Sequence, residues 1–378
     1  MTLPLSICEE ILASAGFEGL SDATESSHKK RLRVIRDQMR ELSSDFAEGI
    51  SSESRYSMAY FLYNFPLNFM KTLYVFGEIS IRRPDFLTPR QRYRILDIGC
   101  GEGAGMYGAY YALKSLDGSG NTRLNGIDGS RKMLERARDM AARLRRRGED
   151  LTAGFANRDL TDIRNALPRK RYDIIICSNS LAEIIREETL PNKYIGILLG
   201  HLCENGILVI IEPALKKYAR RLMQLRDDLV KHKAAQVILP CLHREKCSLL
   251  KIDSRDEWCH ESVAWKPPAF LRILNKGLNR EIDTLKFTYL VIARTKSQHV
   301  LPEGYRVISG LLKEKGRMRI FLCTERGRVE LVRLNRSKSG KNLLFGRIHK
   351  GDLIKLHDIV VRNPDYWEVN FQTVVEIL

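Results

Sequence analysis

Short apolar runs alternate with longer amphipathic stretches between residues 92 and 294, and this alternation predicts a parallel β-sheet with connecting helices. The first run, residues 95–98, breaks into a glycine-rich turn that leads to a helix-like stretch at 106–116. Further strand-like runs follow at 123–127, 154–157, 172–177, 206–212 and 287–294. Stretches with helical spacing, such as 130–147 and 214–233, separate some of them. The pattern indicates an α/β domain with a Rossmann-like sheet.

Residues 1–90 are predicted to be helical. Within residues 27–46, apolar side chains recur at spacings of three and four, at Leu32, Ile35, Met39 and Leu42. Residues 56–81 are rich in aromatics, which we expect to pack against the next domain rather than to stack on bases. Pro66 is expected to start or kink a helix there.

The C-terminal part is predicted to be rich in β-structure. Short alternating runs at 305–308, 317–323, 329–334 and 358–362 are separated by glycines, which is typical of a small, OB-like barrel. We therefore expect three regions: a helical region at 1–90, a Rossmann-like α/β domain at 91–297 with a cysteine-rich insertion at 239–260, and a basic β-rich domain at 298–378.

The glycine-rich turn predicts a cofactor site. Gly99, Gly101 and Gly103 alternate after a strand that contains Asp97. Gly99-x-Gly101-x-x-Ala104 nearly fits the dinucleotide fingerprint. However, an acid inside the strand and alternating glycines are more typical of class I methyltransferases. We therefore expect S-adenosylmethionine rather than a dinucleotide.

Polar residues follow the later strands. Asp128, Asp159 and Ser178 come after the second, third and fourth strands. Because the carboxyl ends of parallel strands meet at one edge of a sheet, these residues should line one crevice with Gly99. Asp128 is placed to accept both ribose hydroxyls and Asp159 to face an adenine amino group. The predicted cofactor-binding residues are Asp97, Gly99, Gly101, Gly103, Asp128, Asp159 and Ser178.

The charge of the chain points to a polyanion partner. The net charge is +17, and residues 296–352 hold 14 Lys/Arg against five Asp/Glu. Ribosomal RNA is the commonest such partner. No apolar run reaches membrane-spanning length. The first basic residue, Lys29, follows five acids, which is the wrong sign for a presequence. We expect a cytoplasmic monomer rather than a mitochondrial matrix protein.

A second candidate site lies in the segment 239–260. Cys241, Cys247 and Cys259 occupy a polar stretch, whereas buried structural cysteines normally sit in apolar runs. Three soft ligands within a short segment suggest a metal or an iron–sulfur cluster. Their spacing matches no standard zinc finger or ferredoxin run. A fourth ligand could be Cys323, the only later cysteine, or one of the local residues His243 and His260.

Several motifs together resemble a known family. They are LDIGCGEGAG, SNSLAEI, IEP, PCLH-x3-C with a later WCH, KFTYLVIAR, and a strand ending in Cys323. In this order they resemble the methyltransferase-like family of small-ribosomal-subunit proteins, from about residue 55 to 352. The resemblance implies a class I methyltransferase fold, a four-iron four-sulfur cluster, and association with the small ribosomal subunit during its assembly. Carried over by position, the cluster ligands are Cys241, Cys247, Cys259 and Cys323; zinc is the alternative metal.

The chemistry stays open between two hypotheses. Enzymes that methylate base amino groups usually carry Asn-Pro-Pro-aromatic after the fourth strand, where this chain has Ser178-Asn179-Ser180-Leu181. Pro240-Cys241 superficially fits the nucleophile of a pyrimidine carbon-5 methyltransferase, but its cysteine neighbours favour a cluster ligand. The protein is either an enzyme that methylates small-subunit RNA or a catalytically inactive, RNA-binding assembly factor. No catalytic residue can be named from the sequence.

Overall fold

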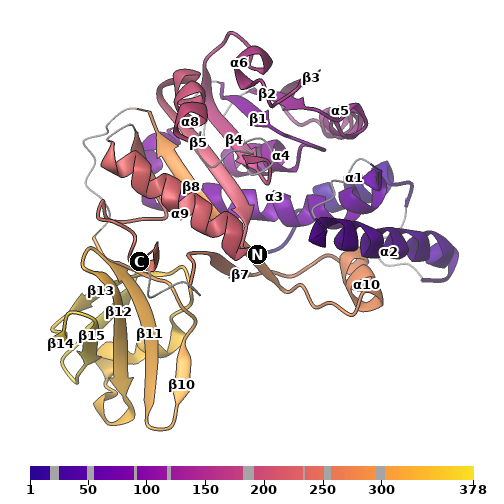
Figure 1. Ribbon diagram of the computed structural model, residues 1–378. Coiled ribbons are helices and arrows are strands. Elements are labelled where there is room, and N and C mark those ends of the chain that lie inside the picture. The colour runs from indigo at the N-terminus through magenta and orange to yellow at the C-terminus, as the bar shows by residue number, and fades with distance from the viewer. Residues whose placement is uncertain are drawn as a thin grey trace. The chain divides into compact units, whose positions relative to one another are not determined.

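The computed structural model describes residues 1–17, 25–48, 55–88, 92–116, 121–181, 191–232, 235–250, 257–294 and 303–378 (Figure 1). The chain forms two compact units. The first unit consists of Met1–Ile211 and Ala264–Leu285, and the second of Glu212–Val263 and Lys286–Leu378. Among the described residues, none of the helices is long and apolar enough to cross a membrane.

The described part of the first unit contains a parallel sheet in the order β3-β2-β1-β4-β5. Its strands are β1 (Arg94–Ile98), β2 (Thr122–Asp128), β3 (Leu151–Asn157), β4 (Tyr172–Ser178) and β5 (Leu202–Pro213). Each lies on a run that the sequence predicts as a strand. β4 is buried over six of its seven residues, as expected for a strand that is covered on both faces.

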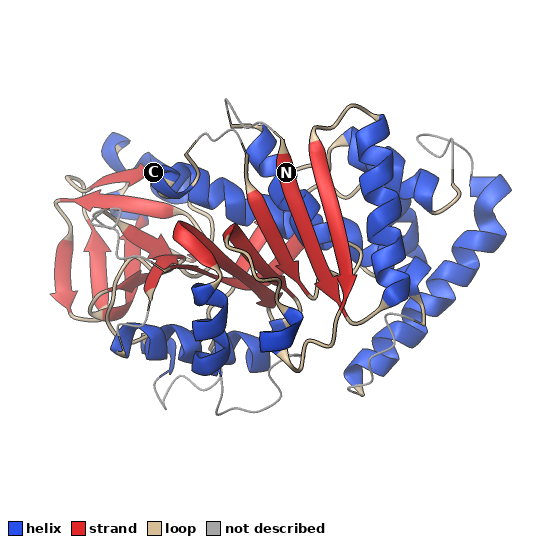
Figure 2. Ribbon diagram, turned by 90° about the horizontal axis from the view of Figure 1, so that it is seen from above, coloured by secondary structure: helices blue, strands red, loops and turns tan. Residues whose placement is uncertain are grey.

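Helices connect these strands by crossovers. They are α4 (Ala104–Lys114), α5 (Arg131–Arg146), α6 (Ile163–Ala166) and α8 (Pro191–Gly200). The chain runs from β1 outward to β3 and then returns to β4 and β5. Because crossovers between parallel strands are right-handed, this reversal places α4 and α5 on one face of the sheet and α6 and α8 on the other (Figures 1 and 2). The point of reversal, between β1 and β4, is where α/β sheets bind ligands.

The remaining helices of the first unit are α1 (Leu5–Ser14), α2 (Glu25–Ala47), α3 (Ser57–Arg82), the short η1 (Pro84–Phe86) and α10 (Ala269–Gly277). The aromatic side chains of Phe61, Phe65 and Phe69 in α3 are buried, which confirms that they pack rather than stack on bases. Pro66 lies inside α3 and not at its start. A Cβ on Gly108 of α4 would lie 2.6 Å from the Phe69 carbonyl oxygen, so this glycine lets α3 and α4 approach closely.

The second unit begins with α9 (Lys216–Lys231), β6 (Gln236–Leu239), the short η2 (Ser248–Leu250) and β7 (Glu261–Ala264). β8 (Thr284–Ala293) pairs with β6 in antiparallel fashion and also with β7. The α9 helix buries Ala219, Leu222, Met223, Leu225 and Leu229 on one face, together with Arg226.

The rest of the second unit is a curled sheet in the order β14-β15-β12-β11-β9-β13-β16, with β10 on β11. Its elements are β9 (Tyr305–Val307), β10 (Leu312–Glu314), β11 (Arg317–Thr324), β12 (Gly327–Leu334), η4 (Asn335–Ser337), η5 (Gly340–Arg347), β13 (Leu353–His357), β14 (Val360–Asn363), β15 (Tyr366–Val369) and β16 (Val374–Ile377). Val307, Ile320, Leu322, Val329, Leu331 and Phe345 form much of its core.

Part of the strand prediction for this sheet is wrong. The run 358–362 is not one strand, because Asp358 has a left-handed backbone with φ of 55° and β14 starts only at Val360. The strands β13, β15 and β16 are absent from the prediction. Each has four or five residues, too few for an alternating pattern to stand out.

Candidate functional site

The glycine-rich turn between β1 and α4 has a backbone that only glycine adopts readily. Gly99, Gly101 and Gly103 have φ angles of 66°, 50° and 88°, in the left-handed region. A Cβ on Gly99 would lie 2.4 Å from the Cβ of Ser180, so any side chain there would overlap its neighbour. Ser180 is fixed in turn, because its hydroxyl donates to the Ile98 carbonyl at 2.7 Å. The turn is therefore held tightly against the end of β4.

Two carboxylates hold this turn. The buried Asp97 accepts a hydrogen bond from the Met106 N–H through Oδ2 at 3.0 Å, and its Oδ1 has no partner among the described residues. Asp128 accepts from the N–H groups of Gly101 and Ser130 at 2.8 and 2.7 Å. Asp128 thus ties the turn to the end of β2, a role that the sequence does not reveal. Each of its oxygens keeps a lone pair for a further donor.

Burial governs the protonation of both acids. It raises the pKa of the Asp97 carboxyl to about 7, opposed by the Met106 N–H and reinforced by the nearby charge of Asp128. Burial also raises the pKa of Asp128, although the hydrogen bonds from the backbone N–H groups of Ser130 and Gly101 act in the opposite direction. An ionised acid in this turn is therefore costly until a positive or donating ligand approaches it.

Glu102 is a site residue that sequence reasoning missed. Only 3% of it is exposed, and neither of its carboxylate oxygens has a hydrogen-bond partner among the described residues. Among the described residues, it forms an ion pair with the Arg136 guanidinium at 3.7 Å. Burial raises the pKa of Glu102 well above its ordinary range, Arg136 opposes this, and the charge of Asp128 adds to it. The only sequence signal is an acid inside a glycine turn, which is weak.

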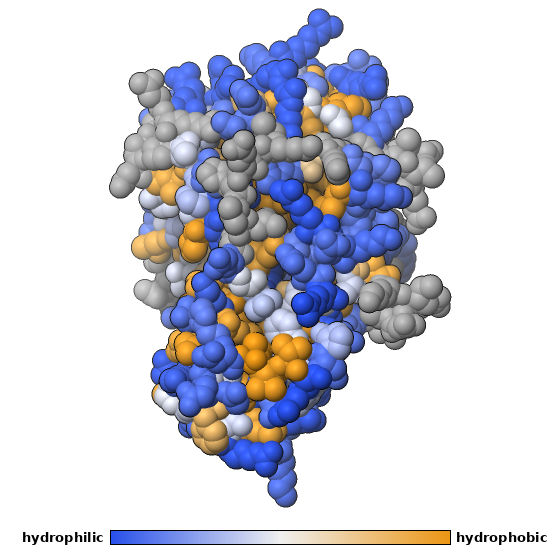
Figure 3. Space-filling view, turned by 90° about the vertical axis from the view of Figure 1, so that its left-hand side faces the viewer, coloured by the Kyte–Doolittle hydropathy of each residue, from blue (hydrophilic) through white to orange (hydrophobic). Residues whose placement is uncertain are grey.

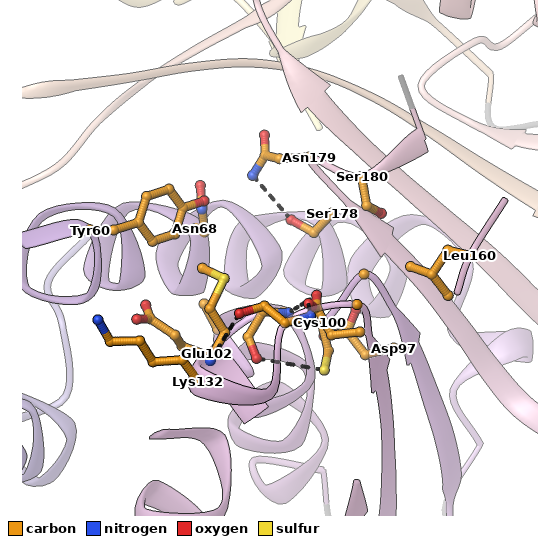
Figure 4. Close-up of a pocket in the computed structure, with 18 of the residues that line it drawn as sticks. Tyr60, Asn68, Asp97, Cys100, Glu102, Lys132, Leu160, Ser178, Asn179 and Ser180 are labelled. Carbon is orange, nitrogen blue, oxygen red and sulfur yellow. Dashed lines mark hydrogen bonds between the residues drawn. The ribbon is translucent and has the colours of Figure 1, made fainter. Parts of the chain in front are cut away.

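These groups line one pocket of about 710 Å³ at the carboxyl edge of the sheet. Of the predicted cofactor-binding residues it brings together Asp97, Gly99, Gly101, Asp128, Asp159 and Ser178. Gly103 is not among the lining residues; it precedes α4 as its N-cap. Further lining comes from Tyr60, Phe65 and Asn68 of α3 and from Arg131, Lys132 and Met133 at the start of α5. Figure 4 shows Glu102 and Lys132 on the side of the pocket near Tyr60, with Leu160 and Ser180 across from them.

The other two predicted contacts differ in their surroundings. The Oδ1 atom of Asp159 accepts hydrogen bonds from the N–H and the hydroxyl of Thr161, at 2.9 and 2.7 Å, so this carboxylate already shapes its own turn. Ser178 lies beside Asn179, which has a left-handed φ of 55° and donates its backbone N–H to Ile211 at 2.8 Å. The segment Ser178–Leu181 therefore presents hydroxyl and amide groups to the pocket but no titratable one.

The four predicted metal-ligand cysteines all belong to the second unit. Burial raises the pKa of Cys247 to about 11 and that of Cys323 to about 12, and the charge of Cys241 adds to both shifts. Burial also raises the pKa of Cys259 well above its ordinary value, with Cys241, Cys247 and Cys323 adding to it. The thiols of the segment 241–259 and of β11 therefore lie close enough to influence one another. None of them forms a disulfide.

The surroundings of these cysteines are hydrogen-bonded. The backbone N–H of Cys247 donates to both oxygens of Asp227, at 3.1 and 3.0 Å. His243 lies with Nε2 3.2 Å from the Cys323 sulfur. No group of three or more His, Cys, Asp or Glu side chains in the described ranges is arranged to hold a metal ion. The thiol set thus suits a soft metal group in its chemistry, but it does not converge on a single ion.

The fold and the pocket together define a protein of the class I methyltransferase type, with a Rossmann-like sheet, a glycine turn after β1 and a pocket at the point where the strand order reverses. The family can be stated as well. The chain belongs to the family described as mitochondrial small ribosomal subunit Rsm22, whose model matches residues 54–353.

The chain is similar to solved structures only at a low level. A putative class I S-adenosylmethionine-dependent methyltransferase from Listeria monocytogenes is 13% identical, with a TM-score of 0.38, over 61% of this chain and 62% of that one. A methyltransferase from Pyrococcus furiosus is 16% identical, with a TM-score of 0.33, over 57% of this chain and 82% of that one. The chain thus spans less than two thirds of the Listeria protein. No curated protein matches the sequence.

Proposed function

We propose that the pocket of the first unit binds S-adenosylmethionine and that the protein works on the small ribosomal subunit. The observation that carries the first part is the buried carboxylate of Glu102, which accepts no hydrogen bond from the described residues and lies in the same pocket as the glycine turn and Asp128. An aminoacyl end of a cofactor has an ammonium for Glu102 and a carboxylate for the cations at Arg131 and Lys132. A ribose has two hydroxyls for the free lone pairs of Asp128. A dinucleotide would offer a pyrophosphate and no ammonium for Glu102.

When bound, S-adenosylmethionine supplies a methyl group that is activated by a positive sulfonium. The described residues around the pocket would hold the cofactor and exclude water, which in-line displacement requires. Among them, Ser178 and Asn179 offer hydrogen bonds but no general base. This supports a role as a cofactor-binding assembly factor at least as well as that of an RNA methyltransferase.

The first experiment is titration calorimetry with S-adenosylmethionine, S-adenosylhomocysteine and NAD. We expect the two S-adenosyl compounds to bind and NAD not to bind. Binding of NAD alone would overturn the cofactor assignment. Asp128→Asn should weaken binding of the S-adenosyl compounds, whereas the exposed Asp162→Asn, which lies outside the pocket, should not.

For the second part, the supporting observations are the family and the net charge of +17. We propose small-subunit RNA as the partner. Co-sedimentation with purified small subunits at low and high salt tests association, since contacts with phosphates weaken as salt rises. Adding S-adenosylmethionine with a labelled methyl group tests catalysis: label in the RNA favours the enzyme, and association without label favours the assembly factor. Absence of co-sedimentation at low salt would contradict both.

We also propose that Cys241, Cys247, Cys259 and Cys323 hold a four-iron four-sulfur cluster. A cluster is larger than one ion, and its thiolate ligands stand at separate corners, so they need not converge on one point. The mutual influence of the four thiols supports this assignment, as does the family resemblance. The bound group would join β11 to the segment 241–259 and so stabilise the second unit.

The test uses protein purified without oxygen. We expect a brown protein with about four irons and four sulfides per chain, as the proposed cluster contains. Cys323→Ser should lose this iron, whereas Cys8→Ser, in the first unit, should keep it. A colourless protein that contains zinc would replace the cluster by the zinc alternative. As to location, we propose the cytoplasm; imaging a tagged protein tests this against the mitochondrion that the family description names.

A further inference from the structure

The second unit has a pocket of its own, of about 840 Å³, at one end of the core of the curled sheet. Its walls include Tyr305, Leu356 and Ile359, which also pack against that core. Val361 of β14 adds an apolar edge that is 52% exposed. Figure 3, which views the side of the molecule that carries β13 to β15, shows an apolar patch among hydrophilic residues on this unit. The mouth of a curled or barrel-like sheet is a common ligand site.

Two aromatic residues line this pocket, and two of its lining residues have a buried polar atom without a hydrogen-bond partner among the described residues. The rings of Tyr305 and Trp367 meet edge to face, 5.1 Å apart. Trp367 is 6% exposed, and its indole N–H has no acceptor among the described residues. His243 is also 6% exposed, and its Nδ1 has no partner in the described ranges. Buried polar atoms without partners are costly unless something that binds there satisfies them.

Cations stand at the rim. Arg244 and Arg326 line the pocket, are exposed, and form no ion pair among the described residues. A third cation, Lys355, is already paired with Glu303 at 2.7 Å. The exposed Glu325 also lines the pocket, so three cations against two acids leave the rim with one net positive charge next to an apolar, aromatic hollow. This combination fits a flat base attached to a phosphate backbone.

We propose that this pocket receives an unpaired base of single-stranded RNA, with neighbouring phosphates on Arg244 and Arg326. The base would lie against Tyr305, and its ring or carbonyl acceptors would receive the Trp367 N–H. A duplex keeps its bases stacked and cannot enter the hollow. This proposal rests on the proposed function, in which RNA is the partner. It identifies the pocket as the part of the protein that binds unpaired nucleotides.

The experiment measures binding of a fluorescent single-stranded RNA of about ten nucleotides, a length suited to a small β-barrel. The pocket variant is Arg244→Ala with Arg326→Ala. The control is Arg336→Ala with Arg347→Ala, which removes the same charge from exposed arginines outside the pocket. We expect the pocket variant to bind at least tenfold more weakly than the control. The slope of log affinity against log salt should fall by about 1.4 for two lost single-strand phosphate contacts.

A second pair tests the apolar hollow. Val361→Asp places a negative charge at its edge, and Leu343→Asp places one at a residue of equal exposure, 53%, outside the pocket. We expect at least a fivefold weaker affinity for Val361→Asp than for Leu343→Asp. Thermal melts of all variants show whether the second unit still folds. A duplex of the same sequence should bind the parent and the pocket variant alike.

The outcomes separate this proposal from the function on which it rests. If both arginine variants lose the same affinity, the pocket does not read RNA, although small-subunit association can still stand. If the pocket variant loses small-subunit association but keeps its affinity for RNA, the pocket binds a ribosomal protein and the proposal is wrong. If the parent binds neither RNA nor the subunit, the proposed function itself fails.

Discussion

Glu102 allows a prediction in which protein stability and ligand affinity change in opposite directions. Glu102 is 3% exposed, its carboxylate accepts no hydrogen bond from the described residues, and it forms an ion pair with Arg136 at 3.7 Å. Burial outweighs that ion pair, because the pKa of Glu102 is raised despite it. The folded protein therefore binds this proton more tightly than the unfolded chain does. The protonated carboxyl of Glu102 makes its whole contribution to the free energy of unfolding below the ordinary pKa of a glutamate, about 4.3. This contribution is lost as the pH rises through the higher pKa that Glu102 has in the folded protein.

Glu102→Gln keeps the shape of the side chain and removes the charge. Because the variant removes the buried charge, at pH 8 the ligand-free variant should be more stable than the parent by about 1.4 kcal/mol for each unit by which the folded pKa of Glu102 exceeds its ordinary value. This corresponds to a melting temperature higher by about 2–4 °C for each kcal/mol. At pH 5 the gain should be smaller, because the parent carboxyl then holds more of its proton.

Affinity for S-adenosylmethionine should fall in the same variant. A hydrogen bond to a charged group contributes about 1.5–3 kcal/mol, which corresponds to a loss of roughly tenfold or more in affinity. Melts at pH 5 and 8 and calorimetric titrations measure the two effects, with the exposed Glu135→Gln of α5 as control. A variant that is less stable than the parent, or that binds the cofactor equally well, would refute the reasoning.

Three further predictions concern single residues. Gly99→Ala should abolish cofactor binding and, in urea unfolding, destabilise the protein by more than about 2 kcal/mol, because the new Cβ overlaps a neighbour and the backbone is also left-handed. The control Gly148→Ala, where φ is 85° and nothing lies within 4 Å, should cost only the backbone strain of about 1–2 kcal/mol. Burial raises the pKa of Asp97 to about 7, so the stability that its neutral form provides is lost between about pH 4 and 7. Asp97→Asn should therefore flatten the plot of the free energy of unfolding against pH in that window, and an unchanged slope of this plot would contradict the reasoning. Arg306→Met should destabilise the second unit by about 3–5 kcal/mol, because it removes the ion pair at 2.8 Å from Glu261, whose side chain is only 5% exposed. Denaturant unfolding measures this, and a nearly unchanged free energy of unfolding would show that the ion pair does not stabilise the unit.

The cofactor pocket could be predicted from the sequence as far as its signals are local. The glycines, Asp97 and the strand-end residues lie in the turn or directly after apolar runs, and the parallel sheet brings their strand ends together. Glu102 escaped prediction because its burial depends on Arg136, a residue 34 positions later in the chain, and on the packing of the first unit. Tyr60 and Asn68 escaped for the same reason, since they come from a helix that the sequence marks only as apolar.

The cysteine group shows a different limit. The sequence left Cys323, His243 and His260 open as the fourth ligand, because local spacing carries no information about a strand that lies far along the chain. In the structure, His243 and His260 are engaged differently: His243 Nε2 lies 3.2 Å from the Cys323 sulfur, and His260 Nε2 lies 2.8 Å from the Lys350 ammonium nitrogen. The tertiary arrangement thus places His243 beside Cys323 and His260 beside Lys350, and the fourth ligand stays a proposal.

Cys323 also connects the two proposals made for the second unit. It lies on β11 among the four thiols, and it lines the RNA pocket together with His243. An RNA base in that pocket would cover Cys323 from solvent, and loss of the bound metal group would release the residues that form the pocket wall. Because coupling between binding free energies is reciprocal, RNA should raise the affinity for iron by the factor by which removal of iron weakens RNA binding. Slower loss of iron to a chelator in the presence of RNA would indicate this coupling.

The measurement follows iron release into a coloured chelator with and without the single-stranded RNA, and RNA affinity before and after release. The variant Arg244→Ala with Arg326→Ala should abolish the protection while the iron content stays at the parent level. Equal release rates with and without saturating RNA would show that the pocket and the cysteine group are energetically independent, although Cys323 belongs to both. Protection that persists in the arginine variant would place the RNA elsewhere on the second unit.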